Sequence, residues 1–117
     1  MSELKILHNP RCSKSRQTLK ILNEKGLEPQ IIEYLKTPIS KQELKFIIKQ
    51  LGFSSPRQLM RKGEDAYKQQ NLNDLTLTED LLINAMLITP KLIERPIVIF
   101  NGRAAIGRPP ESILDIL

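Results

Sequence analysis

Short apolar runs alternate with amphipathic stretches along the chain. Residues 4–7 form an apolar run that predicts a first strand. From about Ser13, apolar residues recur at helical spacing until Gly26, which predicts a helix with a glycine stop. Residues 30–35 predict a second strand, and the length of the connection between the two strands suits a parallel crossover.

Helix-start signals recur in the middle third, where a serine or threonine precedes an acidic residue or a proline. These signals are Ser40, Ser55 and Thr78. Residues 64–72 predict a further short, polar helix. We therefore expect a helical block over about residues 40–90.

The last quarter of the chain returns to strands. Residues 96–100 are β-branched and apolar after the opening proline, which is typical of a buried strand. Asn101-Gly102 predicts a tight hairpin, because both central residues of a type I′ turn need positive φ. A returning strand over 104–107 and a last helix over 109–117 complete the expected order, which is β-α-β, helices, then β-β-α in an α/β protein.

Composition limits the classes of function. The 117 residues are 40% hydrophobic and 26% charged, as in a single soluble domain spanning residues 1–117. No run of 18 apolar residues predicts a membrane span, and no signal peptide is visible, so we expect a cytoplasmic protein without a membrane partner. The net charge of +5 is interleaved with acidic residues and aromatic residues make up only 4%, so no nucleic-acid partner is expected.

The chain has one cysteine, Cys12, and one histidine, His8. A single cysteine cannot form an internal disulfide, and these two residues cannot supply a zinc site, so we expect a reduced thiol and no bound metal. Spacing excludes two thiol chemistries. Thr18 stands where a cysteine phosphatase needs arginine, and Ser15 stands where a dithiol oxidoreductase needs its second cysteine.

Two interpretations of Cys12 are open on these grounds. A lone cysteine is commonly an inert, buried residue. Alternatively, Cys12 is a reactive thiolate, because it lies between a strand and a helix start and close in sequence to Arg11, Lys14 and Arg16. His8 is either a structural residue or one that stabilises the thiolate or orients a substrate. Any mixed disulfide would have to be resolved by an outside thiol.

Three distant arginines would extend a thiol site to an oxyanion site. They are Arg61, Arg95 and Arg108. Each is either a surface charge or an anion ligand, and the guanidinium fork suits tetrahedral oxyanions. The Arg95-Pro96 bond is a candidate cis turn that would aim the arginine into the site.

Four segments in this order resemble the glutaredoxin-coupled arsenate reductase (ArsC) family, and together they span the chain. They are HNPRCSKSR from residue 8, LMRK from 59, RPIV from 95 and GRP from 107. HNPRCSKSR and NGRAAIGRPP further resemble a shorter subgroup carried on bacterial chromosomes. The resemblance implies a thioredoxin-like fold, with a small mixed four-stranded sheet and a helical insertion.

The resemblance also implies an activity: an oxidoreductase that reduces arsenate to arsenite in arsenic detoxification. Glutathione would be the co-substrate and a glutaredoxin the partner of a monomer without a bound cofactor. Cys12 would be the nucleophile that forms a thioarsenate intermediate, and His8 would help to keep it ionised. The expected substrate-binding residues are Arg61, Arg95, Arg108, Ser15 and Arg16.

Two other functions remain open. The first is a thiol oxidoreductase of the same fold that acts on another oxyanion or a glutathione-linked substrate. The second is a non-enzymatic regulator of the Spx type, which binds RNA polymerase. Spx-type proteins are associated with an N-terminal C-x-x-C switch, and Ser15 removes it here.

Overall fold

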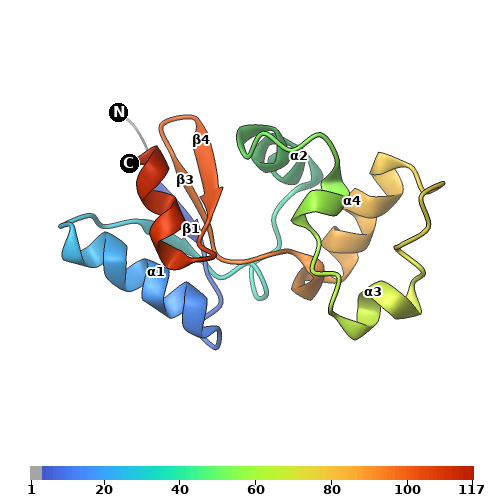
Figure 1. The fold of residues 1–117 in the computed structure, drawn as a ribbon, viewed down its shortest axis with the longest axis horizontal. Coiled ribbons are helices and arrows are strands. Elements are labelled where there is room, and N and C mark those ends of the chain that lie inside the picture. The colour runs from blue at the N-terminus through green and yellow to red at the C-terminus, as the bar shows by residue number, and fades with distance from the viewer. Residues whose placement is uncertain (1–3) are drawn as a thin grey trace. The chain divides into compact units, whose positions relative to one another are not determined.

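The computed structural model describes residues 4–117 and divides them into two compact units. The described part of the first unit is residues 4–37 and Arg95–Leu117, and the second unit is Pro38–Glu94 (Figure 1). The second unit corresponds to the helical insertion that the sequence places at about 40–90. That both units form one domain over residues 1–117 stays a prediction.

A four-stranded mixed sheet forms the centre of the first unit, in the order β2-β1-β3-β4. Strands β1 (Leu4–Leu7) and β2 (Gln30–Ile32) are parallel, whereas β3 (Ile97–Phe100) is antiparallel to both β1 and β4 (Arg103–Ile106). This arrangement confirms the predicted β-α-β and β-β-α order around a mixed sheet.

One face of this sheet is covered by α1 (Ser13–Glu24) and the 3₁₀ helix η3 (Pro110–Ile116), which also contact each other (Figure 1). Ile6 of β1 lies opposite Val98 of β3, so their side chains share a face. These two residues form one core cluster with Leu22, Ile113 and Ile116. Burying each such side chain contributes about 1.5–3 kcal/mol, which holds α1 and η3 against the sheet.

The hairpin between β3 and β4 follows the sequence prediction. Asn101 and Gly102 have φ of 55° and 78°, as a type I′ turn requires. Other boundaries differ from the prediction. The strand expected over 30–35 ends at Ile32, because the chain turns and the N–H of Tyr34 donates to the Ile32 carbonyl at 3.0 Å.

The second unit is helical, as predicted. Its elements are α2 (Lys41–Gln50), η1 (Pro56–Leu59), α3 (Asp65–Gln69), α4 (Glu79–Ile88) and η2 (Pro90–Leu92). The side chains of Ser40, Ser55 and Thr78 all cap helix N-termini, so each predicted start signal is confirmed. The helix expected over 64–72 is shorter, because Asn71 adopts φ 53° and ends it. No helix in residues 4–117 is long and apolar enough to cross a membrane.

Candidate active site

Cys12 is the N-cap residue of α1, with extended φ and ψ of −92° and 124°. Its carbonyl accepts the first helical hydrogen bond, from the N–H of Arg16 at 3.0 Å. The side chain is 9% exposed. Because the N–H groups of the first turn have no partners inside a helix, this end of α1 attracts negative charge. The thiol therefore lies where an anion is favoured.

Asn9 shapes the loop that carries Cys12 from the end of β1 to α1. Its side-chain oxygen accepts a hydrogen bond from the N–H of Arg11 at 3.0 Å, which is an Asx turn. Its carbonyl accepts a second from the N–H of Cys12 at 2.9 Å. Arg16 reaches back from α1, where its Nη1 donates to the Pro10 carbonyl at 2.9 Å. The loop is thus fixed at both ends.

Arg108 brings a cation to the sulfur from the far end of the chain. Its Nη2 lies 3.6 Å from Cys12 Sγ, and its Nε donates to the Arg95 carbonyl at 2.8 Å. One guanidinium thereby joins the thiol to the loop before β3. The Arg95-Pro96 bond is cis, as the sequence predicted, and Arg108-Pro109 is also cis.

Gly107 precedes Arg108, and its lack of a side chain lets this part of the chain pack closely against Pro96 and Thr18. A Cβ on Gly107 would lie 2.8 Å from Pro96 Cγ and would also clash with Oγ1 of Thr18. The Gly107 N–H donates to the Pro96 carbonyl at 3.0 Å, and Thr18 Oγ1 donates to the Lys14 carbonyl at 2.8 Å. Three segments therefore meet at this glycine, immediately before the arginine that contacts Cys12.

Gly107→Ala is expected to destabilise the fold by about 1–3 kcal/mol, because the added methyl group overpacks a closed contact. The displaced loop should also carry Arg108 away from the thiol. Urea unfolding measures the first effect. Gly63→Ala is the matched control, since a Cβ there meets nothing within 4 Å. Equal losses in both variants would show that the contact with Pro96 and Thr18 is not what makes position 107 sensitive to a side chain.

His8 follows the last residue of β1, and its backbone N–H donates to the Ile32 carbonyl at 2.9 Å. The ring is 6% exposed, and its Nδ1 lies 2.6 Å from Oγ of the fully buried Ser15. Burial lowers the pKa of His8 below its usual value; the negative charge of Glu33 opposes this, and Arg16 adds a smaller lowering. A lowered pKa favours the neutral imidazole at neutral pH.

The first unit contains six of the predicted site residues, and Arg61 belongs to the second. Arg61 Nη1 lies 2.9 Å from Glu64 Oε1, and its Nε lies 3.5 Å from Glu94 Oε1. Its backbone N–H donates to the Leu92 carbonyl at 2.7 Å. The catalytic and binding roles of all seven residues stay predictions. Asn9, Thr18 and Gly107, which shape the site, were not among them.

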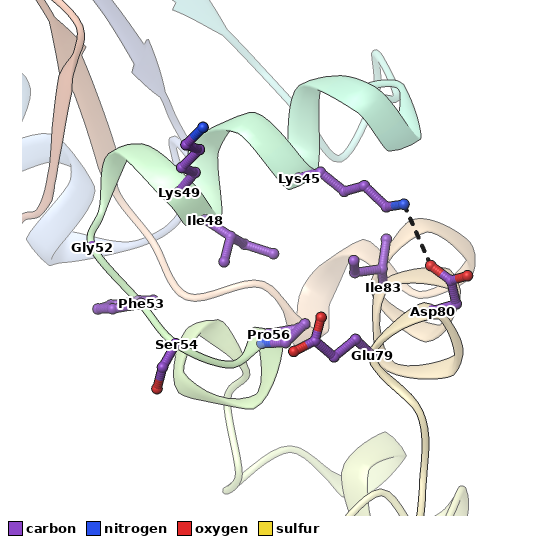
Figure 2. Close-up of a pocket in the computed structure, with 10 residues that line it drawn as sticks. All are labelled: Lys45, Ile48, Lys49, Gly52, Phe53, Ser54, Pro56, Glu79, Asp80 and Ile83. Carbon is purple, nitrogen blue, oxygen red and sulfur yellow. Dashed lines mark ion pairs between the residues drawn. The ribbon is translucent and has the colours of Figure 1, made fainter.

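A separate pocket of about 480 Å³ lies within the second unit, between the end of α2 and the start of α4 (Figure 2). Lys45 Nζ lies 3.4 Å from Asp80 Oδ1 at its rim, and Ile48 and Ile83 line it. None of the seven predicted site residues lines this pocket. The candidate active site is therefore the region around Cys12.

A single cysteine at a helix N-terminus beside an arginine, on a small mixed sheet, is consistent with the thioredoxin-like fold class. The family model described as the ArsC family matches residues 7–116, so the chain belongs to the ArsC family.

Proteins from several bacteria are similar over nearly the whole chain. The uncharacterized Escherichia coli K12 protein YfgD is 55% identical over 98% of this chain and 97% of its own length. A Neisseria meningitidis protein named arsenate reductase is 48% identical over the full length of both chains. The solved structure of an arsenate reductase from Vibrio cholerae matches with a TM-score of 0.96 and 52% identity, over 98% of each chain. The thioredoxin-like prediction is thereby confirmed.

Proposed function

We propose that this protein reduces arsenate to arsenite with Cys12 as the nucleophile. The observation that carries the proposal is the 3.6 Å approach of Arg108 Nη2 to Cys12 Sγ, at the N-terminus of α1. Membership of the ArsC family and the names of the relatives from Neisseria and Vibrio support arsenate as the substrate. Because the reaction needs a reduced thiol and glutathione, we place the protein in the cytoplasm.

The first step joins sulfur to arsenic. The Cys12 thiolate attacks arsenic(V), an S–As bond forms, and one arsenate oxygen leaves as water after taking up protons. The thiolate and arsenate are both anions and repel each other. A unit positive charge about 4 Å away offsets this by about 1 kcal/mol in water and about 4 kcal/mol at an effective dielectric constant of 20. Arg108 is exposed, so its stabilising energy lies nearer to the value for water.

The electrons for the reduction come from two outside thiols. Glutathione replaces a second oxygen on arsenic, again with loss of water. The thiolate of a glutaredoxin then attacks the glutathione sulfur, and a disulfide between the two forms. The electron pair of the broken As–S bond stays on arsenic, which falls from arsenic(V) to arsenic(III). Water finally cleaves the bond to Cys12 and releases arsenite. This scheme suits a chain with one cysteine.

The arginines complete the proposed site. Arg95 and Arg108 belong to the same unit as Cys12, and the Arg95 carbonyl is held by Arg108 Nε. We propose that both bind the oxyanion. Arg61 is the third proposed anion ligand, and its guanidinium is oriented by Glu64 and Glu94. Arginine suits this task because it stays protonated and offers several donors in one plane.

A coupled assay tests the proposed function. Oxidation of NADPH is followed with glutathione reductase, a glutaredoxin, glutathione and arsenate, and each component is omitted in turn. We expect the signal to require all of them together with the protein. A signal that persists without arsenate, or that another oxyanion such as selenate produces while arsenate does not, would favour the competing thiol oxidoreductase function.

A further inference from the structure

The His8 ring and the Ser15 hydroxyl form a buried pair beneath the Cys12 loop. Ser15 is 0% exposed and His8 is 6% exposed. Ser15 Oγ lies 2.6 Å from His8 Nδ1, and the backbone N–H of Asn9 donates to the same Oγ at 3.1 Å. Ser15 belongs to the first turn of α1 and His8 follows β1, so this pair joins the two elements that flank Cys12.

The surroundings of the hydroxyl fix the direction of its hydrogen bond. A serine hydroxyl has one proton to donate and lone pairs to accept with. The Asn9 N–H already uses Ser15 Oγ as its acceptor. Within residues 4–117, His8 Nδ1 is the one acceptor that the structure places within hydrogen-bonding distance of the hydroxyl proton. Since a buried polar group needs a partner, Ser15 donates to Nδ1.

This direction determines the form of the imidazole. An Nδ1 that accepts a hydrogen bond carries no proton, so the neutral ring holds its proton on Nε2. Protonation of Nδ1 would leave the Ser15 hydroxyl without its acceptor. Burial of the ring acts in the same direction, while the Glu33 carboxylate favours the charged ring and Arg16 opposes it.

We propose that Ser15 is a positioning residue that holds His8 as the neutral Nε2–H tautomer. His8 then carries its single ring proton on Nε2 and adds no positive charge to the site. This proposal rests on the proposed function of Cys12 and on the support that His8 gives it. In this role the Ser15 hydroxyl bonds to His8 and to the backbone of Asn9, and the substrate-binding role that the family resemblance implies for Ser15 stays a prediction.

Nitrogen-15 NMR of the untagged protein tests the tautomer directly, since His8 is the only histidine of the chain. Long-range proton–nitrogen correlations at neutral pH are expected to show an unprotonated Nδ1 and a protonated Nε2. Ser15→Ala should mix the tautomers, and Ser15→Thr should restore the single form. Ser13→Ala, at an exposed position two residues earlier in the same helix, should leave it unchanged. A wild-type ring that carries its proton on Nδ1, or that is charged, would overturn the proposal.

Alkylation of Cys12 by iodoacetamide shows whether Ser15 acts through His8. At neutral pH, Ser15→Ala and His8→Gln are each expected to slow alkylation of Cys12 by about tenfold. An effect of this size is typical when a residue that orients a functional side chain is removed. The double variant should be no slower than His8→Gln alone. A further slowing in the double variant would mean that Ser15 acts directly on the thiol, against the proposal. The assay contains no arsenate, so its outcome is independent of whether arsenate is the substrate.

Discussion

Cys12→Ser is expected to reduce arsenate-dependent NADPH oxidation to the rate seen without the protein, a loss of about 10³-fold or more. A serine hydroxyl remains protonated at neutral pH and is a poor nucleophile toward arsenic, whereas a thiolate is a good one. No second cysteine exists in the chain to replace it. The coupled assay with glutathione and glutaredoxin measures the loss.

Two controls make this result specific to the sulfur. The side chains of cysteine and serine are similar in size, so Cys12→Ser should unfold in urea near the wild-type midpoint. Mass spectrometry of the wild type after incubation with arsenate and glutathione should give an adduct on the peptide that contains Cys12. Activity retained in a folded Cys12→Ser variant would show that another group performs the chemistry.

Much of the fold follows from local signals in the sequence. The Asn101-Gly102 turn, the Ser40 cap and the Thr78 cap each depend on a few neighbouring residues, and each prediction is confirmed. The boundaries were harder to predict because tertiary contacts set them. The strand expected to reach Leu35 stops at Ile32, where its parallel pairing with β1 ends. The last helix is a 3₁₀ helix, a distinction that the pattern of apolar residues does not make.

The candidate site also combines residues that are close in sequence with residues that only the fold brings together. His8 and Cys12 lie in one short segment, so their sequence spacing already suggested a shared site. Arg108 is 96 residues away from Cys12 along the chain. Its approach depends on the path of the loop after β4, which passes α1 at Gly107 with no room for a side chain. No spacing in the sequence encodes that path, so the residues alone left Arg108 as either a surface charge or an anion ligand, and the family resemblance favoured the second.

Ser15 shows a different limit of sequence-based prediction. The family resemblance implied that Ser15 binds the substrate, and that role stays a prediction, but the burial of Ser15 could not be read from composition. In the structure Ser15 faces inward, like Thr18 one turn later in α1, and both side chains are fully buried. Ser15 thus joins α1 to the segment before Cys12, whereas the Thr18 hydroxyl bonds within α1, to the Lys14 carbonyl.

Arg108→Ala is expected to lower kcat/KM for arsenate by about 10²-fold, because it removes a donor positioned where negative charge gathers. Arg108→Lys should fall between wild type and Arg108→Ala. A lysine keeps the charge but has one nitrogen, and it cannot contact both Cys12 Sγ and the Arg95 carbonyl as the guanidinium does. Steady-state kinetics with varied arsenate measure both variants.

Arg103→Ala is the matched control, because it removes the same charge from an exposed position on β4, five residues earlier. Its kcat/KM should stay close to that of the wild type, since the effect of a distant exposed charge is screened by salt. Equal losses in the two variants would mean that the net charge of the protein, and not the contact with Cys12, attracts the oxyanion. A loss in Arg108→Ala that persists at high salt while Arg103→Ala remains active would place the effect at the sulfur, since a direct donor contact is screened far less than a distant charge.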